Sequence, residues 1–193
     1  MITNGDCRDK TDSQLVSLTL KNQDYFLCII KRYEDKLLRY IRRISGLSRE
    51  DAEDVLQNVF IKVYRNLNSY NQDLKFSSWI YRIAHNQVIS EFRNKKARPE
   101  LLSSKESELI FEFIESDLNT EKEVELKLLK KDINKVLNRL EEKYREVLVL
   151  NFLEEKSYQE ISDILKKPIG TVATLISRAK NAFKKEISKQ DIF

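Results

Sequence analysis

Glycine and proline are nearly absent from this chain, whose 193 residues include three glycines and two prolines. Strand-rich folds use both residues in their many tight turns, so this scarcity argues against an all-β protein. Leucine, lysine, glutamate and isoleucine are abundant instead, as is typical of helices. The composition therefore predicts an all-α fold.

Cysteine is scarce too. Cys7 and Cys28 belong to no C-x-x-C or Cys/His spacing, which argues against a zinc site and against a disulfide framework. We therefore expect two reduced thiols and a reducing cytosol. No N-terminal apolar run resembles a signal peptide, and no segment approaches membrane-spanning length. The sequence predicts a cytoplasmic protein with no direct membrane insertion.

The charge is segregated along the chain, although the net charge is only +4. Residues 75–98 hold six lysines and arginines against one acid, and residues 166–189 hold seven against one. Between them, residues 99–127 hold nine acids against three bases. Two basic segments around an acidic one suggest two nucleic-acid-facing modules and a connector. An ordinary solvated acidic loop is the alternative for the connector.

Three units follow from this pattern and from the helical periodicity. We predict an N-terminal helical domain over residues 10–98, an acidic linker over 99–126, and a C-terminal helical domain over 127–190.

The C-terminal domain has the pattern of a helix-turn-helix. Ser157 can cap a first short helix, with Glu160 completing a capping box, and Pro168 ends that helix. Thr171 can then cap a second helix, whose predicted apolar side is formed by Val172, Leu175, Ile176, Ala179, Phe183 and Ile187.

The opposite side of the second helix is polar and basic. Its residues are Thr174, Arg178, Asn181 and Lys185. A polar, basic stripe on a helix that follows a tight turn can enter a major groove and contact base edges. A plain helical hairpin with a solvated basic face is the alternative.

Residues 75–96 hold the only tryptophan and the only histidine of the chain. We expect a helix from Ser77 or Ser78, as N-cap, to about Lys96. Its predicted core stripe is Ile80, Ala84, Val88 and Phe92, and a second stripe is Trp79, Arg82, Asn86 and Arg93.

Aromatic and basic residues also alternate just before this helix, at Tyr70, Lys75 and Phe76. Such interleaving suits single-stranded nucleic acid, because aromatic rings stack on bases while cations hold phosphates. Packing in the core or at a hinge is the alternative for each ring. His85 has no second histidine or cysteine nearby, so we expect it to be a surface or DNA-side polar group.

The preceding segment predicts a helix with two distinct sides. Its apolar stripe is Ala52, Val55, Leu56, Val59, Phe60, Val63 and Leu67, and its other side presents Asp54, Gln57, Asn58, Ile61 and Arg65. An exposed isoleucine among acid and amide groups fits a protein–protein contact better than DNA. A solvated face with one stray isoleucine is the alternative.

With these residues in view, the chain resembles a bacterial RNA polymerase sigma factor of the extracytoplasmic-function (ECF) group. Three segments carry the resemblance, in family order: "DAEDVLQNVFIKVYRNL", "FSSWIYRIAHNQVISEFRNKK" and "KYREVLVLNFLEEKSYQEISDILKKPIGTVATLISRAK". It covers about residues 12–187.

The resemblance implies a subunit that directs the polymerase core to promoters and melts the minus-ten element. It implies three partners: the β′ clamp helices of the core, promoter DNA and an anti-sigma factor. It implies no enzymatic activity and no cofactor. The chain departs from the family pattern at Ser90, where an acid is usual, and at Ala173 and Leu175, where bases are common.

Three residue sets follow from the resemblance taken together with the helix faces, the loop and the cap described above. The polymerase-facing set is Asp54, Gln57, Asn58 and Ile61. The minus-ten set is Tyr70, Lys75, Trp79, Tyr81, Arg82, Ile83, Asn86 and Arg93. The minus-thirty-five set is Thr171, Thr174, Ser177, Arg178, Asn181 and Lys185.

Two other functions compete with this interpretation. A stand-alone helix-turn-helix regulator would explain the C-terminal half but leave the face around Ile61 without a role. A metal-dependent nuclease would need Asp51, Glu53, Asp54 and His85 to converge. Neighbouring positions on a helix point about 100° apart, so the three acids do not face one metal.

Overall fold

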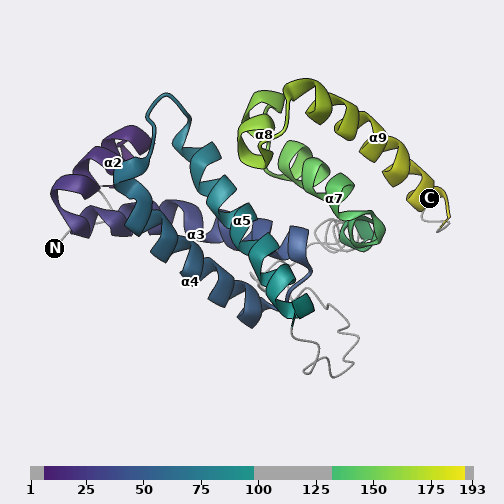
Figure 1. Ribbon diagram of the computed structural model, residues 1–193, viewed down its shortest axis with the longest axis horizontal. Helices are drawn as coiled ribbons and strands as arrows, with labels where there is room; N and C mark the ends of the chain where they lie inside the picture. The colour runs from purple at the N-terminus through teal and green to yellow at the C-terminus, as the bar shows by residue number, and fades with distance from the viewer. Residues whose placement is uncertain (1–6, 98–131, 190–193) are drawn as a thin grey trace, which may run out of the picture.

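The structure of the protein is a computed structural model, which describes residues 7–97 and 132–189. Every regular element in those two ranges is a helix, as the composition predicts (Figure 1). None of these helices is both long and apolar enough to cross a membrane. The linker predicted over residues 99–126 lies outside the described ranges.

Among the described residues, the N-terminal domain contains the α-helices α2 to α5 and two short 3₁₀ turns, preceded by helical residues at positions 7 and 8. Their bounds are α2 Asp12–Lys21, η1 Gln23–Tyr25, α3 Phe26–Ser45, α4 Arg49–Asn66, η2 Leu67–Ser69 and α5 Phe76–Ala97.

Local chemistry explains where these helices begin and end. Thr11 and Gln14 form a capping box at the start of α2, and the Ser48 hydroxyl accepts a hydrogen bond from the Asp51 amide at the start of α4. Gly46 ends α3 with a φ of 68°, a left-handed conformation that glycine adopts without a steric penalty.

The domain core lies where α3, α4 and α5 meet. The whole predicted apolar stripe of α4 is buried, from Ala52 to Leu67. Ile80, Ala84 and Val88 of α5 are buried as predicted. The prediction is wrong for Phe92, which lies near the C-terminal end of α5 and is 37% exposed.

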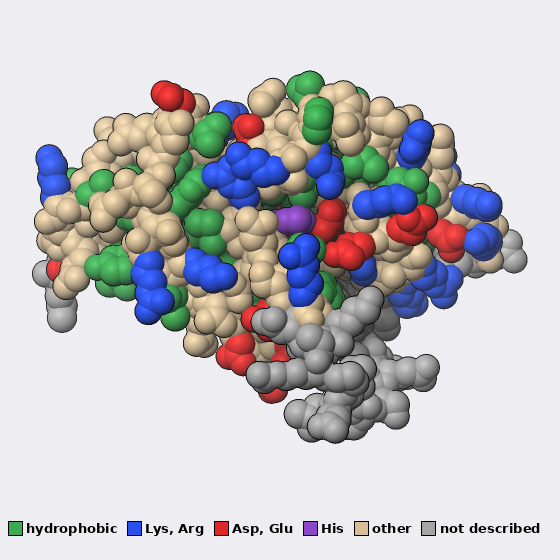
Figure 2. All heavy atoms as spheres, in the orientation of Figure 1, with side chains coloured by type: hydrophobic (Ala, Val, Ile, Leu, Met, Phe, Trp, Pro, Cys, Tyr) green, Lys and Arg blue, Asp and Glu red, His purple; other side chains and the backbone are tan. Residues whose placement is uncertain are grey.

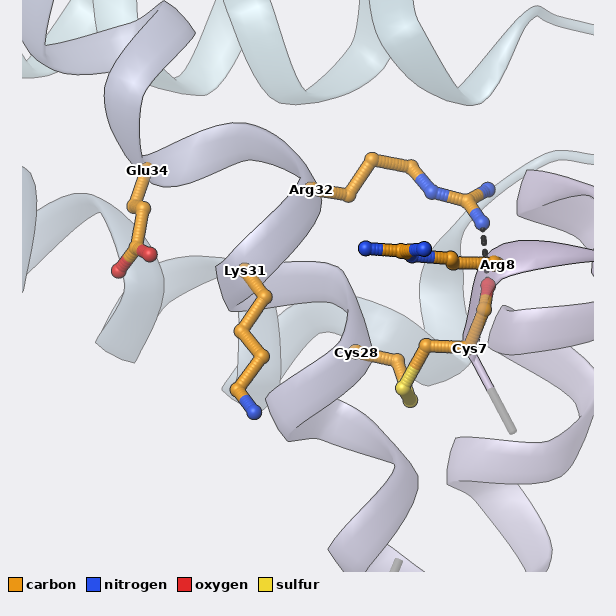
Figure 3. A pocket seen from close by; sticks show the side chains of 6 residues that line it. All are labelled: Cys7, Arg8, Cys28, Lys31, Arg32 and Glu34. Carbon is orange, nitrogen blue, oxygen red and sulfur yellow. Dashed lines mark hydrogen bonds between the residues drawn. A yellow bond between two sulfur atoms is a disulfide. The ribbon is translucent and has the colours of Figure 1, made fainter. Parts of the chain in front are cut away.

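A disulfide joins Cys7 to Cys28 on α3, with 5.3 Å between the two Cα atoms. The expectation of two reduced thiols is wrong, because the segment before α2 folds back onto α3, which a spacing of 21 residues does not reveal. Arg32 holds the same segment by donating to the carbonyl oxygens of Cys7, drawn as a dashed line in Figure 3, and of Lys10. Its third contact is an ion pair with Asp12 at 2.8 Å.

The C-terminal domain begins with a helical stretch over residues 132–139. It continues with α7 Glu142–Leu148, the π-helix η4 Val149–Leu153, α8 Tyr158–Leu165 and α9 Ile169–Ser188. Val172, Ile176 and Ala179 of α9 are buried, while Leu175, Phe183 and Ile187 are partly buried. The predicted apolar side of α9 therefore faces the core of this domain.

The two domains pack directly against each other. The helix α5 of the first lies beside α8 of the second, and α3 contacts α7 and η4 (Figure 1). This junction covers one side of α5.

Candidate nucleic-acid interface

The helix-turn-helix is formed by α8, the turn 166–168 and α9. Ser157 and Glu160 make the predicted capping box, and Lys166 takes a left-handed conformation with a φ of 54°. Ser162 braces the turn, since its hydroxyl donates to the carbonyl oxygen of Lys167 at 2.6 Å. The prediction of Thr171 as N-cap is wrong: α9 already begins at Ile169, because the fixed backbone of Pro168 serves as the N-cap.

All six residues of the predicted minus-thirty-five set are exposed on α9. They are Thr171, Thr174, Ser177, Arg178, Asn181 and Lys185. The Thr174 hydroxyl donates its hydrogen to the carbonyl oxygen of Gly170, so its oxygen is left to act as an acceptor. The structure thus gives a polar, basic face on the second helix of a helix-turn-helix.

The predicted polymerase-facing set is fully exposed on α4, but it divides between two hollows. Gln57 and Ile61 line a groove between α3 and α4 with Ile30, Leu38 and Phe60. Glu34, Asp35 and Glu53 also line it, so the apolar groove has an acidic rim. Sequence analysis missed the contribution of α3, because helical periodicity does not show which helix packs alongside.

Asp54 and Asn58 line a second, more polar hollow. Its other lining residues are Leu47, Asp51, Val55 and Glu91. This hollow lies between α4 and the C-terminal third of α5, so the two halves of the predicted polymerase-facing set have different neighbours.

The aromatic residues before and at the start of α5 form one compact cluster. The Trp79 ring centroid lies 5.2 Å from that of Tyr70 and 5.5 Å from that of Phe76, and Tyr33 of α3 stacks edge-on against Phe76 at 5.7 Å. The Tyr70 hydroxyl donates to the carbonyl oxygen of Leu74.

Trp79 is therefore placed differently from the prediction. Its side chain is only 7% exposed, and it belongs to the core rather than to an open stripe with Arg82 and Asn86. The aromatic loop before the helix folds over the indole, which the spacing within the helix cannot reveal. The start of α5 also differs, because the helix begins at Phe76 and Ser78 lies buried in its first turn.

The residues of the predicted minus-ten set differ in their solvent exposure. Lys75, Asn86 and Arg93 are exposed, and Arg82 and Ile83 are partly buried. Tyr70, Trp79 and Tyr81 are buried.

Tyr81 is covered by the C-terminal domain. Its hydroxyl donates to Glu154 Oε2 at 2.7 Å, and Arg43 Nη1 donates to Glu154 Oε1 at 2.8 Å. Burial and the negative charge of Glu154 raise the pKa of the Tyr81 hydroxyl well above its ordinary value. The Lys156 ammonium lies 4.5 Å from the centroid of the Tyr81 ring, within cation–π range.

His85 also lies at the domain junction, with its Nε2 atom 2.9 Å from Glu146 Oε1. Its side chain is only 13% exposed, so the prediction that His85 is a surface or DNA-side polar group is wrong. The sequence could not indicate the partner, because the two residues are 61 positions apart. Within the described ranges no three His, Cys, Asp or Glu residues are grouped to hold a metal ion.

Two family models match the chain, one on each domain. Residues 29–98 match Sigma-70 region 2, and residues 130–183 match Sigma-70, region 4. The fold and its two candidate faces therefore define a two-domain helical protein of the sigma-70 kind.

Curated relatives give the particular group. The chain is 37% identical over 171 residues to the ECF RNA polymerase sigma factor SigW of Bacillus subtilis, covering 86% of this chain and 90% of that protein. It is 32% identical to the ECF RNA polymerase sigma-E factor of Escherichia coli K12, covering 92% and 94%. The chain belongs to the ECF RNA polymerase sigma factors.

Solved structures have the same fold. One is CnrH in complex with the cytosolic domain of CnrY, with a TM-score of 0.68, 20% identity, and coverage of 93% of this chain and 99% of that one. Another is the sigma factor RpoE with the anti-sigma factor NepR from Bartonella quintana, with a TM-score of 0.67, 23% identity, and coverage of 86% and 98%. Family membership makes the chain a sigma factor rather than a stand-alone helix-turn-helix regulator; the relatives are sigma factors, which are not enzymes.

Proposed function

We propose that this sigma factor acts in the cytoplasm, guides the RNA polymerase core to specific promoters and opens the minus-ten element. The observation that carries the proposal is the presence, in one chain, of an exposed helix-turn-helix face on α9 and a separate exposed face on α4 that includes Ile61. A DNA-binding regulator has a use for the first face but not for the second.

The groove between α3 and α4 is the proposed docking site for the β′ clamp helices. Ile61 is 48% exposed at this groove, and an exposed apolar side chain beside polar ones is typical of protein–protein contacts. The acidic rim of Glu34, Asp35 and Glu53 favours a partner helix that carries basic residues. Asp54 and Asn58 extend the contact towards α5. An anti-sigma factor is a further proposed partner, as expected from the family.

Promoter opening would be achieved without covalent chemistry. Extruding a base costs a few kcal/mol, so the protein must bind unstacked bases more tightly than paired ones. Asn86 is exposed on α5 and can hydrogen-bond a base edge, while Lys75 and Arg93 supply charge for phosphates. The aromatic cluster of Tyr70, Phe76 and Trp79 would hold the loop beside them.

The upstream element would be bound as duplex DNA. The exposed face of α9 offers Arg178 and Lys185 as cations and Thr174 and Asn181 as hydrogen-bonding groups. Phosphate contacts would position the helix, and the uncharged groups would read base edges.

Run-off transcription with bacterial core polymerase on a promoter library tests the proposal. We expect initiation from a subset of promoters, and we expect Asn86→Ala to reduce it about tenfold, the cost of one base contact. Asn68→Ala, at an exposed asparagine outside the predicted sets, serves as the control and should initiate like the wild type. Absence of initiation from every promoter would refute the proposed function.

A further inference from the structure

A cavity of about 550 Å³ lies where the N-terminal segment crosses the start of α3, and the Cys7–Cys28 disulfide forms part of its wall. Its other lining residues are Arg8, Lys31, Arg32 and Glu34 (Figure 3). Cavities of about 300–1,000 Å³ accommodate small-molecule ligands. Apart from Glu34, the lining residues belong neither to the proposed DNA sites nor to the proposed polymerase groove.

The lining of the cavity is mainly cationic. Arg8 and Lys31 are exposed, and in the view of Figure 3 their charged ends flank the disulfide. Asp12 neutralises Arg32 through an ion pair at 2.8 Å, and the two exposed cations still outnumber the carboxylate of Glu34. Elsewhere cations and carboxylates lie next to each other, as Figure 2 shows around the purple histidine at the domain junction. The cavity therefore favours a ligand with net negative charge.

The two sulfurs of the disulfide differ in access. Cys28 is only 1% exposed, whereas Cys7 is partly exposed. The rate of thiol–disulfide exchange depends on which sulfur the attacking thiolate can reach and on the pKa of the thiol that leaves. Attack at Cys7 makes Cys28 the leaving group. Lys31 and Arg32 follow Cys28 by three and four positions on α3, so both cations lie on its side of the helix and stabilise a departing thiolate.

A disulfide is unusual in the cytoplasm, where this protein is proposed to act. Cytoplasmic disulfides are mostly transient and serve catalysis or redox sensing. Arg32 gives the N-terminal segment a second attachment to α3, through the carbonyl oxygens of Cys7 and Lys10. The two sulfurs therefore stay near each other when the disulfide opens, as reversible exchange requires.

We propose that the Cys7–Cys28 disulfide is a reversible redox site and that the cavity binds its reductant, a small thiol with net negative charge. The thiolate of that reductant attacks Cys7 Sγ. The bond between the two protein sulfurs breaks, its electron pair goes to Cys28 Sγ, which takes a proton from solvent, and a mixed disulfide forms on Cys7. A second thiolate attacks the reductant's sulfur in the mixed disulfide, which leaves two reduced cysteines and one small disulfide. Reaction with that small disulfide reverses the steps.

Rates of disulfide opening by two thiols of opposite charge test the proposal in the full, oxidised chain. Glutathione is the anionic probe and cysteamine the cationic one, and alkylation followed by intact mass measures the fraction opened. Arg8→Gln/Lys31→Gln should react with glutathione about tenfold more slowly than the wild type, because the local concentration of the anion falls, and with cysteamine no more slowly. Lys36→Gln/Arg39→Gln removes the same two charges from exposed positions of α3 outside the cavity and should react with both thiols like the wild type.

The position of the mixed disulfide tests the direction of attack. The reaction of the wild type with glutathione is stopped early with acid, before the second thiolate has reacted, and peptide masses locate the adduct. Glutathione should be found on Cys7. Glutathione found on Cys28 would overturn the assigned attack.

Two rate results would overturn the site. Equal slowing of Arg8→Gln/Lys31→Gln with glutathione and with cysteamine would mean that the substitutions change access to the disulfide and not the charge around it. An unchanged rate with glutathione would mean that the cavity does not bind the reductant. The inference uses only the cytoplasmic location from the proposed function, and its tests contain neither polymerase nor DNA, so a failure of the proposed function would be seen separately, as an absence of transcription.

Discussion

Trp79 holds neighbouring residues in place and does not offer an open ring surface on which a base could stack. Its ring packs against those of Tyr70 and Phe76, which also contact each other edge-on at 5.3 Å. The cluster fixes the loop that leads into α5, and thereby the first turn of the helix on which Asn86 lies.

This placement predicts different effects for the two residues. Trp79→Ala should lower the free energy of unfolding by about 3–5 kcal/mol, because it removes a buried aromatic side chain, and Trp79→Phe should lower it less. Asn86→Ala, at an exposed position, should stay within about 0.5 kcal/mol of the wild type. Urea denaturation measures all three. A Trp79→Ala variant of wild-type stability that fails in transcription would show instead that the indole itself contacts DNA.

Individual helices were predictable because their signals are local. The buried stripe of α4 and the capping box of Ser157 and Glu160 depend on residues a few positions apart. What the sequence could not show depends on distant partners. Tyr81 is 73 residues from Glu154, and no local sequence pattern around either residue indicates that the two are in contact. The burial of Trp79 likewise depends on how a loop folds over a helix.

The attachment of the N-terminal segment to α3 is another contact between distant residues. The disulfide closes a loop of 21 residues, and Arg32 binds the same segment through two carbonyl oxygens. Closing a loop of this length restricts the unfolded chain and stabilises the fold by about 3 kcal/mol in the chain-entropy treatment.

Reduction should therefore destabilise the protein measurably. We expect the oxidised wild type to lose about 3 kcal/mol of unfolding free energy on addition of dithiothreitol. Cys7→Ser should unfold like the reduced wild type and be insensitive to the reductant. Equal stability of the oxidised and reduced wild type would mean that Arg32 alone holds the segment.

Across the whole molecule, the distribution of charge matters more for DNA binding than the net charge does. A net charge of +4 is small for a chain that binds DNA, yet the exposed face of α9 is basic. Duplex binding should therefore follow the cations on that face rather than the net charge.

Salt dependence tests this expectation. Arg178→Ala should weaken duplex binding and, if the guanidinium neutralises one phosphate, reduce the slope of log K against log salt by about one. Lys184→Ala removes a cation that is also exposed but lies outside the predicted set, and should change the slope less. Equal slopes for the two variants would show that the charge of α9 acts without regard to position. Fluorescence anisotropy over a range of salt concentrations supplies the measurement.

The π-helix before Glu154 sets the direction in which that residue points. In η4 the Glu154 amide donates to the carbonyl oxygen of Val149, five residues earlier, at 3.0 Å. A π-turn accommodates one residue more than an α-turn, and one residue corresponds to a rotation of about 100° around a helix. Removing one residue from η4 would thus turn Glu154 away from Arg43 and Tyr81 while leaving all three residues in the sequence. Whether a related chain forms this contact between its domains would then depend on the length of the segment before the glutamate, so that a one-residue deletion there would matter as much as a substitution.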